Sequence, residues 1–308
     1  MSQPNYAYFE SKIVPYSEAR IGVMTHALNY GTGAFAGVRG YWNADRKQLF
    51  IFRPLDHFKR FLNSARILRS ALTIQPEELV DITIQLLRKE SYKEDCYIRP
   101  LYYKAEETIG VRLHDLRDEI TIFAIPFTRY IPNDESAHVT FSSWRRVSDN
   151  AIPPRGKLTG AYVNSALIKS DAHYAGFDEA LVLNEDGHIS EGSAENFFMI
   201  RNGVLITPPV TDNILEGITR RSIMTLAREE LGLEIVERSI DRTEVYICDE
   251  AFLTGTAVQL AAITQVDHRP IGSGEMGEAT AQLRDLYDRA LRGKLSSYEH
   301  WNQAVYVD

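Results

Sequence analysis

The sequence predicts an α+β fold, because runs typical of strands and runs typical of helices are interleaved without the strict alternation of a Rossmann or barrel fold. The composition is that of a folded protein, since 44% of the 308 residues are hydrophobic and 25% are charged. A chain of this length can bury a sizeable core. Two prolines, Pro126 and Pro132, with a polar tail after the second, indicate that the fold has two parts.

The individual elements follow from periodicity and from residue type. Runs rich in β-branched and aromatic residues are expected to be strands: Gln48 to Phe52, Tyr97 to Tyr103, Glu119 to Pro126, Ala137 to Phe141, Glu179 to Leu183, Asn196 to Arg201 and Ala251 to Thr254. Runs with apolar residues at helical spacing are expected to be helices: His57 to Leu72, Glu77 to Glu90, Asn164 to Ala175, and a run that opens at Gly217 and ends at Gly232.

A linker is expected at these prolines, over residues 127–137. It leaves a first domain over residues 1–126 and a second domain over residues 138–308. No internal repeat or low-complexity segment is visible.

Charge and terminal sequence argue against several classes of protein. The formal net charge is -8, and no long block of lysine and arginine occurs, so a nucleic-acid partner is not expected. The first residues lack the pattern of a signal peptide, and no run approaches 18 uninterrupted apolar residues. We therefore expect a cytoplasmic protein without a membrane partner.

The two cysteines, Cys96 and Cys248, lie in separate apolar, strand-like contexts rather than in a short-spaced pair. We expect both to be buried packing thiols, and we expect no metal site.

The segment from Glu191 to Arg220 places a carboxylate ahead of a helix that starts after Gly217. The first backbone N–H groups of a helix have no partner within it and favour an anion, so this start suits a phosphate group. Many helices begin after glycine, and alone this feature carries little weight.

The ordered pattern is more specific than its parts. It reads Glu191-x-Ser193-x-x-Asn196-Phe197-Phe198, Leu205-x-Thr207 and Leu215-x-Gly217-Ile218-x-Arg220, and it resembles the signature of the class IV aminotransferases, which use pyridoxal 5'-phosphate (PLP). The resemblance implies a two-domain fold of type IV. Its smaller N-terminal domain is α/β, and its larger C-terminal domain has a β-barrel-like core.

By this resemblance, Lys157 is the catalytic residue that forms the Schiff base with PLP. The chemistry requires a lysine, an acid near the pyridine nitrogen, and donors to the phenolic oxygen and the phosphate. The resemblance assigns these cofactor roles to Glu191 (ring nitrogen), Tyr162 (phenolic oxygen), and Arg60, Gly217, Ile218, Thr219 and Thr256 (phosphate). An arginine suits phosphate because its planar fork donates two hydrogen bonds.

Two N-terminal segments, residues 26–39 and Tyr97-Ile98-Arg99-Pro100, look like those of branched-chain amino acid aminotransferases. The implied substrate residues are Tyr30, Phe35, Gly37, Arg39, Tyr97, Arg99, Val111 and Ala257. Of these, Arg99 would meet the side-chain carboxylate of glutamate, while Tyr30 and Val111 would reach in from a second subunit. A homodimer is therefore expected, with a hexamer as the larger assembly.

The expected reaction moves the amino group between leucine, isoleucine or valine and 2-oxoglutarate through PLP, as in branched-chain amino acid biosynthesis. Two alternatives stay open: a D-amino acid or (R)-amine transaminase on the same scaffold, and a binding or structural protein without a cofactor. The chain departs from the family at Ala36, which stands where glutamate is frequent. This departure concerns the range of substrate side chains that the enzyme accepts.

Overall fold

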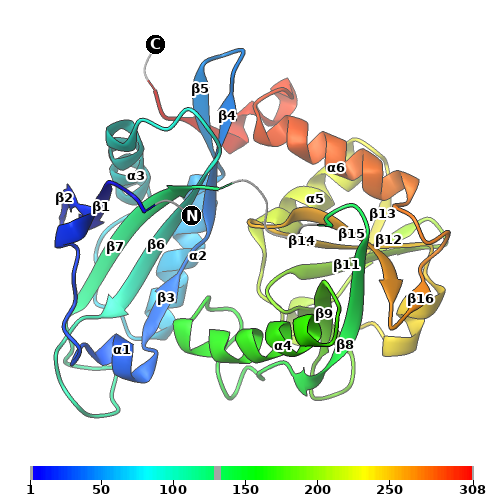
Figure 1. The fold of residues 1–308 in the computed structure, drawn as a ribbon, viewed down its shortest axis with the longest axis horizontal. Coiled ribbons are helices and arrows are strands. Elements are labelled where there is room, and N and C mark those ends of the chain that lie inside the picture. Colours follow the sequence, from blue (N-terminus) through cyan, green and yellow to red (C-terminus); the bar gives the residue numbers. More distant parts are fainter. Residues whose placement is uncertain (1–2, 128–132, 307–308) are drawn as a thin grey trace. The chain divides into compact units, whose positions relative to one another are not determined.

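The computed structural model describes residues 3–127 and 133–306, which form two compact units (Figure 1). The first unit contains the described residues 3–127, 156–160 and 289–306, and the second contains residues 133–155 and 161–288. Of the expected linker over 127–137, residues 128–132 lie outside the described residues. The expected first domain, residues 1–126, lacks the two segments that return to the first unit, and the expected second domain, residues 138–308, contains them.

Both returning segments are attached through the backbone. Leu158 forms an isolated β-bridge with Ala34, and a strand at the C-terminal end, β17 (Asn302–Ala304), pairs with β5 (Gln48–Phe52). Backbone pairing of this kind satisfies N–H and C=O groups that burial would otherwise leave without partners.

The first unit is built on an antiparallel sheet with strand order β17-β5-β4-β6-β7-β1-β2, and β3 also pairs with β6. Besides β17 and β5, its strands are β1 (Tyr6–Phe9), β2 (Lys12–Pro15), β3 (Gly33–Phe35), β4 (Val38–Asn43), β6 (Cys96–Lys104) and β7 (Asp118–Pro126). Burial alternates along most of β6, as expected for a strand with one face against a core. The helices of this unit are α1 (His26–Tyr30), α2 (Pro54–Ile67) and α3 (Pro76–Glu90).

Helix α2 differs at both ends from the predicted span of His57 to Leu72, which is therefore wrong at its boundaries. It begins at Pro54, where the fixed φ of proline suits a first turn. It ends at Ile67 because Arg69 is left-handed (φ 55°). The N–H of Ser70 then bonds the carbonyl of Ala65, and the N–H of Arg69 bonds that of Arg66, which together form a Schellman motif.

The second unit contains a mixed sheet with strand order β10-β9-β8-β15-β14-β11-β12-β13, and β16 pairs with β15. The strands are β8 (Ala137–Arg145), β9 (Glu179–Leu183), β10 (Ile189–Gly192), β11 (Asn196–Arg201), β12 (Val204–Thr207), β13 (Glu234–Glu237), β14 (Glu250–Gly255), β15 (Gln259–Val266) and β16 (Arg269–Pro270). Apolar side chains from β8, β9, β11, β14 and β15 form a buried core. The α+β prediction is confirmed.

The helices of the second unit are α4 (Tyr162–Tyr174), α5 (Ile218–Glu229) and most of α6 (Glu278–Leu291), whose last residues belong to the first unit. Helix α6 was not predicted. Its start is held by a residue distant in sequence, because the Glu250 carboxylate accepts the N–H of Ala279 at 3.1 Å and the N–H and hydroxyl of Thr280 at 2.8 and 2.5 Å. A negative charge at this position also complements the helix dipole.

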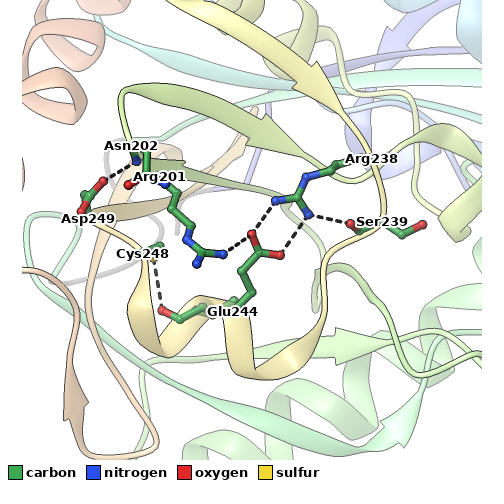
Figure 2. Close-up of polar contacts among 8 residues, drawn as sticks. Arg201, Asn202, Arg238, Ser239, Glu244, Cys248 and Asp249 are labelled. Atoms are coloured by element: carbon green, nitrogen blue, oxygen red, sulfur yellow. Dashed lines mark hydrogen bonds and ion pairs between the residues drawn. The ribbon is translucent and has the colours of Figure 1, made fainter.

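A second carboxylate fastens the 3-10 helix η4 (Arg242–Ile247) (Figure 2). Glu244 accepts hydrogen bonds from Arg201 at 2.8 Å and from both terminal nitrogens of Arg238. These hydrogen bonds, those of Arg238 first, lower the pKa of Glu244. We call Glu244, Arg201 and Arg238 the η4 clamp.

The prediction of two buried packing thiols is confirmed, since Cys96 and Cys248 are free and buried. Burial raises the pKa of each thiol to about 12, so both stay protonated and unreactive at neutral pH. Within the described residues, no helix has the length and apolar character needed to cross a membrane.

Candidate functional site

The backbone of Lys157 is held from both sides within the first unit. Its N–H donates to the hydroxyl of Ser64 at 3.1 Å, and its carbonyl accepts the N–H of Phe35 at 2.9 Å. Two residues further on, the Thr159 hydroxyl donates to the carbonyl of Gly31 at 2.8 Å. The backbone at Lys157 is therefore held rigidly. A side chain that must present its amine in one direction requires such support.

Two cations lie close to the ring of Phe35. The ring centroid is 5.1 Å from Lys157 Nζ and 4.5 Å from the guanidinium carbon of Arg99. Arg99 also donates to the hydroxyl of Tyr97, at 2.9 Å from Nη2. This row brings together four of the predicted site residues.

Gly37 lies against the same row. A Cβ atom at this position would be 2.4 Å from the Tyr97 hydroxyl oxygen, far inside van der Waals contact. The glycine is therefore required by the placement of Tyr97 and not by backbone freedom.

Arg39 is 2% exposed and lies in a network of its own. Its Nη2 donates to the carbonyl of Phe127 at 3.1 Å and is 3.8 Å from Asp95, while its guanidinium lies over the rings of Tyr41 and Phe127. These contacts give Arg39 a structural part in the sheet. Its assignment to the substrate stays a prediction.

Arg60 lies on α2, one turn before Ser64, and is half-buried. The Ser64 hydroxyl donates to the Arg60 carbonyl at 2.9 Å while it accepts the N–H of Lys157. One buried hydroxyl thus links the helix that carries Arg60 to the backbone of Lys157.

Tyr30 is anchored to the loop that contains Val111. Its hydroxyl accepts the N–H of Gly110 at 3.1 Å, and His26 contacts the Gly110 carbonyl at 2.9 Å. Val111 itself is 89% exposed. Helix α1, which ends at Tyr30, is therefore joined to the loop of Val111.

In the second unit, Glu191 on β10 is 3% exposed, and both of its carboxylate oxygens have partners. One oxygen is 2.6 Å from Arg146 Nη2. The other accepts the side-chain amide of Asn196 and the N–H of Leu215, both at 3.0 Å. The carboxylate is therefore held in one orientation by three donors.

Helix α5 begins directly after Gly217, which has no side chain to cap the first N–H groups. Ile218 and Thr219 form its first turn and are 2% and 4% exposed. The Thr219 hydroxyl accepts a hydrogen bond at 3.2 Å from Tyr287 on α6. An uncapped helix start with a hydroxyl beside it is a suitable site for a phosphate.

Thr256 and Ala257 lie in the turn between β14 and β15, and both are half-buried. Tyr162 is the first residue of α4 and is also half-buried. The positions agree with a surface that a small molecule can reach, and the roles of all three residues stay predictions.

Glu195 is a further carboxyl group near Glu191. It is 3% exposed and accepts the N–H of Ala194 at 3.0 Å. Burial, followed by the charge of Glu179, raises the pKa of Glu195 to about 8, because a buried carboxyl group is more stable protonated than charged.

Sequence reasoning did not identify Arg146, Ser64, Glu195 or Tyr287 as parts of the site. Arg146 was visible only as half of an Arg-Arg pair, and Ser64 as one polar residue within an amphipathic helix. Their roles depend on contacts between distant segments, for which the local pattern has no signal. Tyr287 belongs to a helix that was not predicted.

Comparison with known proteins agrees with this geometry. The family model for amino-transferase class IV matches residues 41–266. The chain belongs to the class IV aminotransferases. The predicted family and fold type IV are confirmed.

Relatives and solved structures match nearly the whole chain. A probable branched-chain-amino-acid aminotransferase of Aquifex aeolicus is 46% identical over 302 residues, which are 98% of this chain and 97% of that protein. The PLP form of the branched-chain amino acid aminotransferase of Thermobaculum terrenum is 37% identical, with a TM-score of 0.95 and complete coverage of both chains. The branched-chain aminotransferase of the thermophilic archaeon Thermoproteus uzoniensis, solved with norvaline, is 38% identical, with a TM-score of 0.94 over 98% of this chain and 100% of that one.

Proposed function

We propose that this aminotransferase moves the amino group between the branched-chain L-amino acids leucine, isoleucine and valine and 2-oxoglutarate, by a ping-pong cycle with PLP. Relatives that carry the branched-chain name over nearly the whole chain support this proposal. So does the Thermoproteus uzoniensis enzyme, which was solved with the aliphatic amino acid norvaline. The reaction belongs to branched-chain amino acid biosynthesis, and we propose that it takes place in the cytoplasm.

The donor set of the chain fits PLP. An uncapped helix start with the Thr219 hydroxyl suits the phosphate, and the fixed carboxylate of Glu191 suits a protonated ring nitrogen. When bound, PLP accepts the amino group and withdraws electrons from the substrate. We assign Arg60, Gly217, Ile218, Thr219 and Thr256 to its phosphate, Tyr162 to its phenolic oxygen, and Lys157 to its covalent attachment.

Lys157 has two tasks in this proposal. Its amine holds the cofactor until the amino donor arrives, and it then removes the proton from the substrate Cα. The hydrogen bonds at its backbone N–H and C=O keep the start of the side chain fixed during both tasks. Arg146 and Leu215 keep the Glu191 carboxylate directed at one position.

The observation that carries the substrate assignment is the row formed by Phe35, Arg99 and Tyr97. It places an apolar ring and a guanidinium group side by side. A site that alternates between a branched aliphatic side chain and the carboxylate of glutamate needs both surfaces. We therefore assign Phe35 to the aliphatic side chain, Arg99 with Tyr97 to the carboxylate, and keep Tyr30, Gly37, Arg39, Val111 and Ala257 as substrate residues.

We also propose that the enzyme is at least a homodimer and that a hexamer is its larger form. Among the described residues of the first unit, six large apolar side chains are exposed by 46% or more: Ile21, Val23, Met24, Leu28, Ile109 and Val111. An exposed group of this kind is typical of an interface between subunits. Sedimentation velocity checks this proposal, and a monomer at all concentrations would contradict it.

An amino-donor panel tests the function. L-leucine, L-isoleucine, L-valine and L-glutamate are expected to be donors, while D-alanine and (R)-1-phenylethylamine are expected to be poor ones. Parallel double-reciprocal lines are expected when one substrate is varied at several fixed levels of the other, as in a ping-pong cycle. Turnover of D-alanine or (R)-1-phenylethylamine above that of L-leucine would favour the alternative named above.

A further inference from the structure

Asn196 occupies the point at which three segments of the second unit meet. Its side-chain nitrogen donates to a carboxylate oxygen of Glu191 at 3.0 Å and to the carbonyl of Leu215 at 2.9 Å. Both hydrogens of the amide are therefore used. Asn196 is 6% exposed, so water does not replace either bond cheaply.

The segment from Leu215 to Gly217 also contacts Glu191 and Asn196 through its own backbone. The N–H of Leu215 donates to the same oxygen of Glu191 at 3.0 Å. Two residues later, a Cβ atom on Gly217 would be 2.0 Å from the side-chain oxygen of Asn196. The start of α5 thus rests directly on the Asn196 amide, and only glycine permits this approach.

The third segment follows from strand register. Asn196 is the first residue of β11 and pairs with Thr254 of β14, two residues before Thr256. One residue is therefore joined to the ring-nitrogen carboxylate, to the start of α5 and to the strand that leads into the Thr256 turn.

We propose that Asn196 is a positioning residue that couples the Glu191 carboxylate to the phosphate cradle, so that the two ends of the cofactor are held at a fixed separation. The inference rests on the proposed roles of Glu191 and Thr219. An aspartate at this position has the same shape, but it replaces two N–H donors by acceptors that face a carboxylate and a carbonyl. Both segments would then be released together.

The test uses two probes that report on the two ends separately. Inorganic phosphate binding to the apoprotein reports on the cradle, and pyridoxal, which lacks the phosphate, reports on the ring end. The ring nitrogen is followed by nitrogen NMR of bound, isotope-labelled PLP. The variants are Asn196→Asp, Asn196→Ser, Glu191→Gln and, as a control, Asn184→Asp.

Asn184 is a matched control because it is a 1% exposed amide in the same unit that donates to a carboxylate, that of Asp212, at 3.3 Å. We expect Asn196→Asp to weaken both phosphate and pyridoxal binding by about tenfold each and to shift the ring nitrogen towards its deprotonated form. Asn196→Ser, which keeps one hydroxyl donor, is expected to act in the same direction by less, and it decides the question if the aspartate variant does not fold.

The inference is overturned if Asn196→Asp weakens neither probe or only one of them, or if Asn184→Asp weakens them equally. A separate result bears on the proposed function. If Glu191→Gln leaves the ring nitrogen as protonated as in the wild type, the assignment of Glu191 is wrong. If Glu191→Gln changes the ring nitrogen and Asn196→Asp does not, only the positioning role fails.

Discussion

The predicted site residues of the two units are held by different kinds of contact. In the first unit, the charged groups of Lys157 and Arg99 lie over the ring of Phe35. In the second unit, Glu191 is fixed by three donors at 3.0 Å or less. A contact between a cation and a ring has no fixed donor–acceptor geometry, whereas three donors fix the orientation of a carboxylate. The first arrangement suits groups that act in the reaction, and the second suits a group that holds one position.

The largest effect is expected at Lys157. Lys157→Ala removes both the group that attaches the cofactor and the group that moves the proton, so turnover should fall by at least about 10³-fold. Steady-state assays with L-leucine check this expectation. Lys169→Ala is the control, because Lys169 lies outside the assigned site and pairs with Glu179. A Lys157→Ala variant with near wild-type turnover would refute the assignment.

The second prediction concerns Glu195 in the second unit and the pH dependence of stability. The pKa of Glu195 is raised from its ordinary value of 4.5 to about 8, first by burial and then by Glu179. Between these values the folded protein keeps a proton that the unfolded chain has lost, so rising pH destabilises the fold. Each pKa unit of this rise is worth about 1.4 kcal/mol.

Glu195→Gln removes this dependence. The free energy of unfolding of the variant relative to the wild type should therefore rise from about pH 4.5 to about pH 8 and then stay constant. Urea unfolding at a series of pH values measures the difference. A difference that does not change with pH would show that Glu195 is ionised in the folded protein.

The third prediction breaks the row in the first unit. Gly37→Ala places a methyl group 2.4 Å from the Tyr97 hydroxyl oxygen, which should cost about 1–3 kcal/mol of stability through overpacking. Displacement of Tyr97 also breaks its bond to Arg99, so the KM for 2-oxoglutarate should rise by roughly tenfold. The double variant Gly37→Ala/Tyr97→Phe should recover part of the stability but not the wild-type KM. An unchanged KM in Gly37→Ala would argue against the assignment of Arg99 and Tyr97 to the substrate carboxylate.

The smallest effect is expected in the η4 clamp, which is hydrogen-bonded but lies outside the proposed site (Figure 2). Glu244→Gln should reduce stability by about 1 kcal/mol, because its partly exposed arginines are solvated. Turnover should not change. The pKa of Glu244 is lowered on folding. The stabilisation by Glu244 is therefore present above its unfolded pKa and is lost as the pH falls through its folded pKa. Thermal melts at neutral and acidic pH measure this loss.

Local pattern predicted the buried strands well. The bounds of β5, β9 and β11 agree with the predicted ranges, because each is a short apolar run that stops at turn or polar residues. The predicted ranges of β6, β7, β8 and β14 are shorter than the observed strands. Their ends are extended by pairing with neighbours, which a single run of sequence does not contain.

Contacts between distant segments account for what was not predicted. Helix α6 starts where Glu250 accepts its first N–H groups, and the end of α2 depends on a left-handed Arg69. The signature predicted the presence of Glu191, Asn196 and Gly217, but it did not predict that they touch one another. The spacing of the signature identifies these three residues, but it does not contain the contacts that the Asn196 amide makes with the other two.

The central claim is that the protein is a PLP enzyme with two half-reactions, and the visible spectrum of the purified holoenzyme tests it most directly. We predict a yellow protein whose visible band disappears when L-leucine is added alone. The band should return when 2-oxoglutarate follows, and D-alanine should leave it unchanged. A protein that stays colourless after incubation with PLP, or a band that does not respond to L-leucine, would contradict the account.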